Sequence, residues 1–335
     1  MGRNVNGTVV RGFVMMVAVL ASLLSWASDG VLVRVGIAWQ PYEGNYDRVV
    51  RSIRAAGGEP VILGQLRPVG VDYDGAEVAE RCLDENGILL QDYADAVKRD
   101  TWHGTGADSL LAGVQAVVFL GGGDVCPTLF ATPEPWHGIE AERNYDVARD
   151  LSEFLTMAYC LDHDLPVLGL CRGMQLLGVV SGAPLIQDLP TYYEQCGTHD
   201  RYVHRSARDS KGERHYTPHD VVVTDHESLL WAIAQCDTIH GAPSWHHQAV
   251  ASVDGTLLRV TAVTTDDGIS VIEAIERTDQ TFALGVQYHP EEAVRRHLDH
   301  AADEHRFMPL DEGLAYFRAL IHATKFQHEL HELNN

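Results

Sequence analysis

The sequence is poor in basic residues, in paired cysteines and in segments that would divide it. Lys and Arg number 25 against 47 Asp and Glu in 335 residues, a formal net charge of −22. Nucleic-acid binding needs clustered positive charge, so we expect no nucleic-acid partner. The six cysteines form no Cys-x-x-Cys pair, which argues against a disulfide framework or a cysteine zinc site. No linker rich in Pro, Gly or Ser and no internal repeat interrupts the chain, which favours a single domain.

The sequence contains no long apolar run, and its short uncharged, mostly apolar stretch lies near the start. Residues 1–12 carry Arg3 and Arg11 and no acid, and residues 13–27 are uncharged and mostly apolar. A basic start, a short apolar run and small residues at its end are typical of a secretory signal peptide. A membrane-spanning helix needs about 20 apolar residues, so we expect no permanent span after the leader is removed. Residues 1–27 are therefore predicted to be a signal peptide and 28–335 an exported, periplasmic or extracytoplasmic protein. The alternative is a mis-assigned start and a cytoplasmic protein.

The rest of the chain alternates apolar, β-branched runs with amphipathic stretches. This alternation predicts parallel strands joined by right-handed crossovers, with helices on both faces of the sheet. The expected fold is α/β, a three-layer sandwich with a mostly parallel central sheet. Residues 64–110 lack periodicity and are expected to form an insertion in this single domain. Strands are expected at 31–39, 59–63, 116–120, 165–170, 220–224, 257–263, 271–276 and 282–288, and helices at 45–56, 145–164, 171–180 and 314–326.

Cys171 is the first candidate for chemistry. The sequence LGLCRGMQ (168–175) passes from a buried strand directly into a helix, with Gly169 and Gly173 on either side of the cysteine. This spacing is that of a nucleophile elbow with Cys in place of Ser. The turn would put the sulfur at the carboxyl edge of the sheet and near the positive end of the following helix, which favours the thiolate. The alternative for a cysteine at a strand end is simple packing.

A second strand end, GVQYHPEE (285–292), supplies a base. His289 and Glu291 lie two residues apart, so the carboxylate can bond one ring nitrogen while the other faces Cys171. The alternative is that His289 is an ordinary surface histidine with its hydrogen bonds satisfied, since the chain contains 18 histidines.

A glycine turn, residues 121–123, follows the predicted strand 116–120. Glycines let a backbone approach a ligand closely and aim its amides at developing negative charge. No Gly-Lys-Ser/Thr follows, so a phosphate loop is not expected. One wall of an oxyanion hole, with the amide of Arg172 as the second donor, fits better.

Together these segments resemble the class I glutamine amidotransferase-like superfamily, with its flavodoxin-like sheet, and within it the gamma-glutamyl-gamma-aminobutyrate hydrolase family. The resemblance covers residues 31–326, nearly all the chain after the leader. The motifs that carry it are LPVLGLCRGMQ, QD at 187–188, GGGDVCPTLF, YDVARDLSEF, SWHHQAV, DGISVIEAIE and GVQYHPEE.

The resemblance implies a role for each matching residue. Cys171 would be the nucleophile, His289 its base and Glu291 the group that orients the base. Oxyanion donors would be the amides of Gly122 or Gly123 and of Arg172. The glutamyl pocket would be lined by Gln175, His246, His247 and Gln248. Arg149, Asp150 and Glu153 would form a helix beside the site, or simply a salt-bridge cluster on one helix face, since Arg149 and Glu153 are four residues apart.

The expected function is hydrolysis of the γ-glutamyl amide bond of a small compound through a thioester, with glutamate released. No metal or organic cofactor is expected. The alternatives are a glutaminase that feeds ammonia to a partner synthetase and a non-catalytic binding protein. The amine attached to the glutamyl group and the oligomeric state, a homodimer included, are left open.

Overall fold

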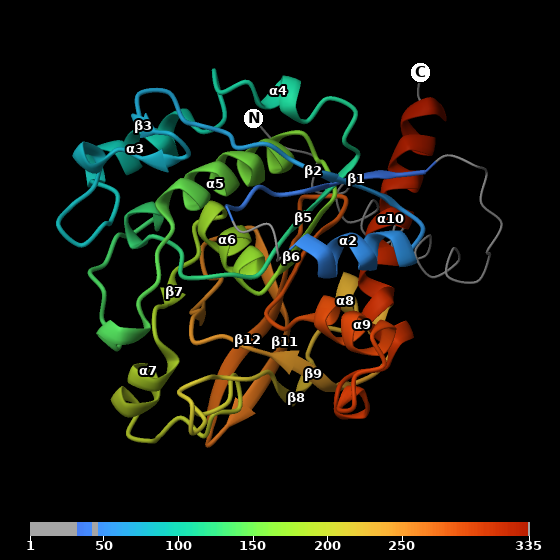
Figure 1. The fold of residues 1–335 in the computed structure, drawn as a ribbon. Coiled ribbons are helices and arrows are strands. Elements are labelled where there is room, and N and C mark those ends of the chain that lie inside the picture. Colours follow the sequence, from blue (N-terminus) through green and yellow to red (C-terminus); the bar gives the residue numbers. More distant parts are fainter. Residues whose placement is uncertain (1–31, 42–45, 334–335) are drawn as a thin grey trace.

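A large central sheet organises the chain in the computed structural model, which describes residues 32–41 and 46–333 (Figure 1). Its nine strands run in the order β2-β1-β5-β6-β13-β12-β11-β8-β9. The first five strands are parallel to one another: β1 (Arg34–Ile37), β2 (Glu59–Ile62), β5 (Ala116–Phe119), β6 (Val167–Leu170) and β13 (Ala283–Val286). The expected α/β fold is confirmed.

Longer antiparallel strands extend the sheet beyond β13. They are β12 (Ile269–Arg277), β11 (Leu258–Asp266), β8 (Thr217–Val223) and β9 (Thr238–Ser244). The sequence did not predict β9, because Gly241 and Pro243 interrupt its apolar residues. As the last strand of the sheet, β9 can tolerate a proline, which pairs with Pro218 on β8.

Helices cover both faces of the sheet, as expected for three layers. The helices α5 (Val147–Asp162) and α6 (Arg172–Val180) pack on one face, in a core that includes Phe119, Leu151 and Met174. The opposite face is covered by α2 (Tyr46–Ala55), α8 (Leu229–Ala234), α9 (Pro290–Leu298) and α10 (Leu310–Leu333) (Figure 1). Alternate residues of each strand point into the two cores, which is why the central strands read as continuous apolar runs.

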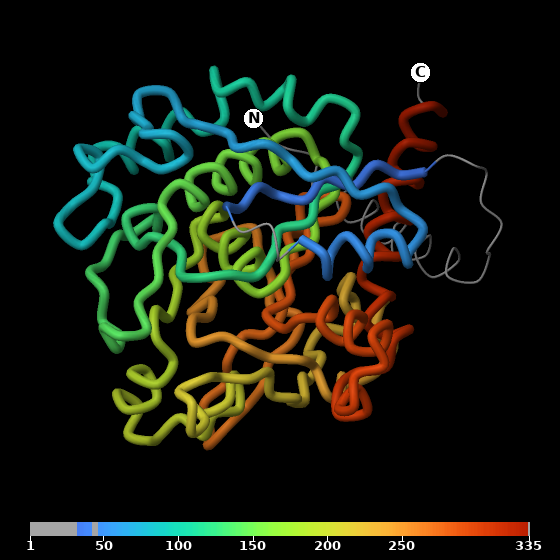
Figure 2. Tube along the Cα trace, in the orientation of Figure 1, coloured from blue at the N-terminus to red at the C-terminus, as the bar shows by residue number. Residues whose placement is uncertain are grey.

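Residues 64–110 are more ordered than their sequence suggested. They contain the short strands β3 (Tyr73–Asp74) and β4 (Glu77–Val78) and the helices α3 (Gln91–Asp100) and α4 (Ala107–Leu110). Their apolar side chains join the core on the side of α5. Figure 2 shows this segment, in blue to cyan, far from the yellow loop 198–216 at the other end of the molecule.

The remaining elements are small. They are the two-stranded pair β7 (Leu185–Ile186) and β10 (Ala249–Val250), helix α7 (Leu189–Gln195) and four short 3₁₀ turns. Among the described residues no helix is long and apolar enough to cross a membrane. The predicted signal peptide, residues 1–27, lies outside the described residues and stays a prediction.

Candidate active site

Cys171 occupies a strained turn between β6 and α6. Its backbone has φ 49° and ψ −103°, a conformation that costs a residue with a side chain about 1–3 kcal/mol. At the two flanking positions, Gly169 and Gly173, there is no room for a Cβ atom. A Cβ on Gly169 would lie 2.6 Å from the backbone carbon of Gly173, and a Cβ on Gly173 would lie 2.5 Å from the carbonyl oxygen of Phe119. The strand–turn–helix geometry predicted around Cys171 is therefore present.

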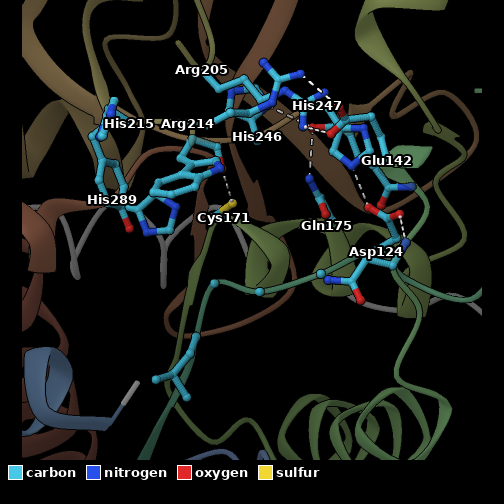
Figure 3. Close-up of a pocket in the computed structure, with 18 of the residues that line it drawn as sticks. Asp124, Glu142, Cys171, Gln175, Arg205, Arg214, His215, His246, His247 and His289 are labelled. Atoms are coloured by element: carbon cyan, nitrogen blue, oxygen red, sulfur yellow. Dashed lines mark hydrogen bonds and ion pairs between the residues drawn. The ribbon is translucent and has the colours of Figure 1, made fainter. Parts of the chain in front are cut away.

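His289 lies beside Cys171 at the end of the adjacent strand β13, where it caps α9 (Figure 3). Its Nδ1 lies 2.7 Å from Oε1 of Glu291, so Nδ1 donates to the carboxylate. The sulfur of Cys171 donates to the backbone oxygen of Trp245 at 3.8 Å and interacts electrostatically with the ring. The structure thus brings together the nucleophile, base and carboxylate that the sequence singled out, all three of them buried.

The surroundings of His289 favour its charged form. Burial works against a charged ring, but the facing Tyr216, Glu291 and Cys171 outweigh it and raise the pKa of His289 well above its usual value. A positive imidazolium beside a sulfur at a helix N-terminus stabilises a thiolate. The pair is suited to nucleophilic attack by sulfur, followed by proton donation from the ring.

The glycine turn 121–123 follows β5 and packs tightly against the histidine. A Cβ on Gly121 would lie 2.5 Å from Cε1 of His289 and 3.5 Å from Cβ of Cys171. A Cβ on Gly123 would lie 2.6 Å from the carbonyl oxygen of Asn144. Within the described part of the chain, the amides of Gly122, Gly123 and Arg172 donate to no other protein group. They remain available to a ligand.

The side chain of Arg172 turns away from the cavity into a buried ionic cluster. It pairs with Asp150 and Glu153 of α5, and Nε of Arg149 donates to Glu153 over 3.0 Å. Arg149 also donates to the carbonyl oxygen of Gly121 over 2.9 Å. The cluster is therefore more than the helix-face salt bridge considered from spacing, because it ties the elbow to the glycine turn.

Gln175 and Gln248 form one polar wall of the cavity. The amide nitrogen of Gln175 donates to the backbone oxygen of Gln248 over 2.9 Å and lies 3.3 Å from Oε1 of Gln287. Gln287 in turn lies 3.5 Å from the sulfur of Cys171. Both Gln175 and Gln248 line the cavity, and their role in binding a glutamyl group stays a prediction.

The two histidines of the SWHHQ loop lie at the same wall but have different surroundings. His247 bonds Asp124 through Nε2 over 2.8 Å and Asp188 through Nδ1 over 3.0 Å. Burial opposes its charge, but the two carboxylates raise the pKa of His247. Both ring nitrogens are used, so His247 is a bridge between loops. His246 donates from Nδ1 to the backbone oxygen of Gln248, and burial lowers the pKa of its ring.

The far side of the cavity is built from residues that sequence reasoning missed. Glu142 pairs with three arginines of the loop 198–216, namely Arg205, Arg208 and Arg214, at 2.8 to 3.1 Å. Burial opposes the charge of Glu142, but these arginines lower its pKa to about 2. No periodicity or motif marks this loop, so only the fold could bring it to the site.

Aromatic residues close the cavity above the histidine. The rings of Tyr216 and His289 pack edge to face with their centroids 5.1 Å apart, and the rings of Trp245 and Tyr216 do so with centroids 5.0 Å apart. Arg48 donates to the Tyr216 hydroxyl over 2.8 Å. Trp245 belongs to the SWHHQ motif and Gln287 to GVQYHPEE, so position within a motif could have drawn attention to both.

A cysteine on a strained elbow, a histidine–carboxylate pair on the next strand and a glycine turn beside them are the arrangement expected of a hydrolase of the glutamine amidotransferase-like class. Residues 101–291 match the family model described as Peptidase C26, and the chain belongs to this family.

Curated relatives carry several names. NtpR of Enterococcus hirae is 32% identical over 185 residues, which are 55% of this chain and 70% of NtpR. A Mycobacterium tuberculosis protein provisionally named a glutamine amidotransferase is 34% identical over 185 residues, 55% of this chain and 53% of that protein. The gamma-glutamyl-gamma-aminobutyrate hydrolase PuuD of Escherichia coli is 32% identical over 151 residues, 45% and 55% of the two chains. The matched region thus spans from about half to 70% of these relatives.

A solved glutamine amidotransferase of Thermotoga maritima is 14% identical, with a TM-score of 0.43, and the match covers 89% of this chain and 98% of that one.

Proposed function

We propose that this protein hydrolyses the γ-glutamyl amide bond of small γ-glutamyl compounds, with Cys171 as nucleophile. The observation that carries the proposal is the meeting of Cys171, His289 and the glycine turn in one cavity of about 820 Å³. Such a volume suits a small ligand. The name of PuuD, a relative in the same family, supports a γ-glutamyl substrate.

The mechanism follows from the positions of these groups. The Cys171 thiolate attacks the γ-carbonyl carbon, and the amides of Gly122 or Gly123 and of Arg172 bind the resulting oxyanion. His289, held by Glu291, gives its proton to the departing amine, which leaves a γ-glutamyl thioester on sulfur. The ring then takes a proton from water, whose oxygen attacks the thioester and releases glutamate. Loss of one oxyanion donor typically costs about 100–1000-fold in rate.

On the side formed by the loop 198–216, the cavity carries a local excess of positive charge, which favours an acidic group of the substrate. One carboxylate, Glu142, faces three guanidinium groups in the loop 198–216. Arg205 is buried, and within the described residues its Nε and Nη2 have no hydrogen-bond partner. A guanidinium group matches a carboxylate in geometry and charge, and a change of the Arg205 rotamer would turn these closed-off donors toward the cavity that the residue already lines. We therefore propose that Arg205 binds a carboxylate of the substrate, either that of the glutamyl group or one on the amine.

The test measures glutamate released from γ-glutamyl-γ-aminobutyrate, from γ-glutamyl peptides and from L-glutamine by the purified protein. We expect hydrolysis of at least one γ-glutamyl amide, and its loss in Cys171→Ala. Cys236→Ala is the matched control, because Cys236 is a half-buried thiol outside the cavity.

Release of glutamate at equal rates by the wild type and Cys171→Ala, or by neither on any γ-glutamyl compound, would contradict the proposal. Hydrolysis of L-glutamine alone would favour the second candidate, an ammonia-supplying glutaminase, a reading that the name of the Mycobacterium tuberculosis relative also supports. Export through residues 1–27 stays a separate proposal, tested by the N-terminal residue of the mature protein.

A further inference from the structure

Behind the polar wall of the cavity lies a buried cluster of three histidines around one glutamate. His204 comes from the loop 198–216, His219 from β8, His246 from the SWHHQ loop and Glu273 from β12. All four side chains are buried. Oε1 of Glu273 lies 3.1 Å from Nδ1 of His204 and 3.6 Å from Nε2 of His246, and Oε2 lies 3.6 Å from Nε2 of His219.

These close approaches are not hydrogen bonds. Within the described residues, the facing nitrogens of all three histidines and both oxygens of Glu273 have no hydrogen-bond partner. Buried polar atoms are nearly always paired, because an unpaired one costs about 1–3 kcal/mol. Three of the groups, His204, His246 and Glu273, bring one such atom each within 4.8 Å of one another and so suit a common partner.

The protonation of His246 shows what kind of partner is needed. Its Nδ1 lies 2.9 Å from the backbone oxygen of Gln248, and a carbonyl oxygen can only accept, so Nδ1 carries the hydrogen. In the neutral ring, Nε2 then presents a lone pair toward the Glu273 carboxylate. A lone pair and a carboxylate repel each other unless a cation lies between them.

The spacing of the three atoms suits a metal ion better than a proton. No proton is shared by a hydrogen bond here: Nε2 of His246 lies 3.6 Å from Oε1 of Glu273, beyond hydrogen-bond distance, and within the described residues Nδ1 of His204 has no hydrogen-bond partner. In tetrahedral zinc sites the bonds to nitrogen and oxygen are about 2.0–2.2 Å, so neighbouring ligand atoms lie about 3.3–3.5 Å apart. The observed 3.1 and 3.6 Å bracket this value. The three ligand atoms all lie within 4.8 Å of one another.

We propose that His204, His246 and Glu273 bind a zinc ion. Two imidazoles and one carboxylate are a common zinc set, and a water molecule would complete the tetrahedron. His219, against the second oxygen of Glu273, would orient the carboxylate, as outer partners of metal ligands commonly do.

The role of the ion would be structural. It would fasten the loop that carries Arg205 and the SWHHQ loop to the central sheet. The backbone oxygen of Glu273 also accepts from the amide of Gln287, whose side chain lies 3.5 Å from the sulfur of Cys171. In this proposal the ion supports the cavity wall and makes no bond to the substrate, so its presence can be tested apart from activity.

The test is metal content by mass spectrometry after purification of the full chain in zinc-supplemented medium and exhaustive dialysis. We expect about one zinc per chain, and a tetrahedral Co²⁺ absorption spectrum after exchange. Glu273→Gln and His204→Ala should each lose the ion. His240→Ala should keep it, because His240 also faces a carboxylate on this part of the sheet but is exposed.

A competing site is the exposed group Asp209, Glu213 and His215. Zinc that persists in Glu273→Gln but disappears in Asp209→Asn would overturn the proposal. So would a wild-type protein with less than about a tenth of an equivalent of zinc and no change of melting temperature on chelation. If the cluster variants do not fold, the wild-type stoichiometry and the Co²⁺ spectrum still decide the question.

Discussion

Gly121 gives the sharpest test of the proposed catalytic geometry. A methyl group at this position would lie 2.5 Å from Cε1 of His289, whereas carbon atoms normally approach to about 3.5 Å. Gly121→Ala should therefore push the ring aside by about 1 Å, and a misplacement of this size costs about 100-fold in rate. That loss corresponds to about 2.7 kcal/mol of transition-state stabilisation.

The assay is kcat and KM for release of p-nitroaniline from γ-glutamyl-p-nitroanilide, with the melting temperature as a check on folding. Gly64→Ala is the matched control, because its new methyl would meet only the end of Leu110, at 3.3 Å and away from the cavity. The loss should appear in kcat. A folded Gly121→Ala that keeps more than about a third of the wild-type kcat would show that the position of His289 does not limit the reaction.

Three further outcomes are expected. Glu153→Gln should lower the free energy of unfolding in urea by about 3–5 kcal/mol, because it leaves buried guanidinium charge unpaired; a loss below about 1 kcal/mol would contradict this. Arg205→Met should raise KM about 10–100-fold for the γ-glutamyl substrate while kcat changes little, and an unchanged KM would remove Arg205 from substrate binding. The raised pKa of His247 means that its bridge stabilises the fold fully below about pH 6.5 and less as the pH rises through the folded value. The difference in melting temperature between wild type and His247→Gln should therefore shrink from pH 6 toward pH 9. A difference that stays constant over this range would show that the charge of His247 does not stabilise the fold.

The local parts of the site could be predicted from sequence because their constraints are local. Gly169 and Gly173 lie two positions from Cys171, and both are dictated by contacts within the elbow and with β5. His289 and Glu291 are likewise close in sequence and meet directly. Helix α9 was missed although Pro290 stands at its first position and arginines in its last turn, which are ordinary signals of helix start and end.

Other parts depend on tertiary contacts that no local pattern encodes. The loop 198–216 has no regular structure and is held by residues distant in sequence: Glu142 pairs with its arginines, Asp267 pairs with Arg201, and Ser244 donates to the backbone oxygen of His204. The histidine cluster is assembled from segments between residues 204 and 273, and none of its spacings is that of a metal motif. The sequence led us to expect no metal, and the proposed ion departs from that expectation.

The proposed reacting groups and the arginines of the loop 198–216 lie on separate parts of the fold, which bears on the choice of substrate. The groups proposed to make and break bonds follow the ends of β5, β6 and β13, adjacent parallel strands whose carboxyl ends meet at one edge of the sheet. The arginines that would select the substrate lie on a separate loop, held by Glu142, by Asp267 and by the hydrogen bonds that the backbone oxygen of His204 accepts. Changes in that loop can therefore alter which γ-glutamyl compound binds without moving Cys171 or His289. Substitutions there should act on KM, whereas substitutions at the strand ends should act on kcat.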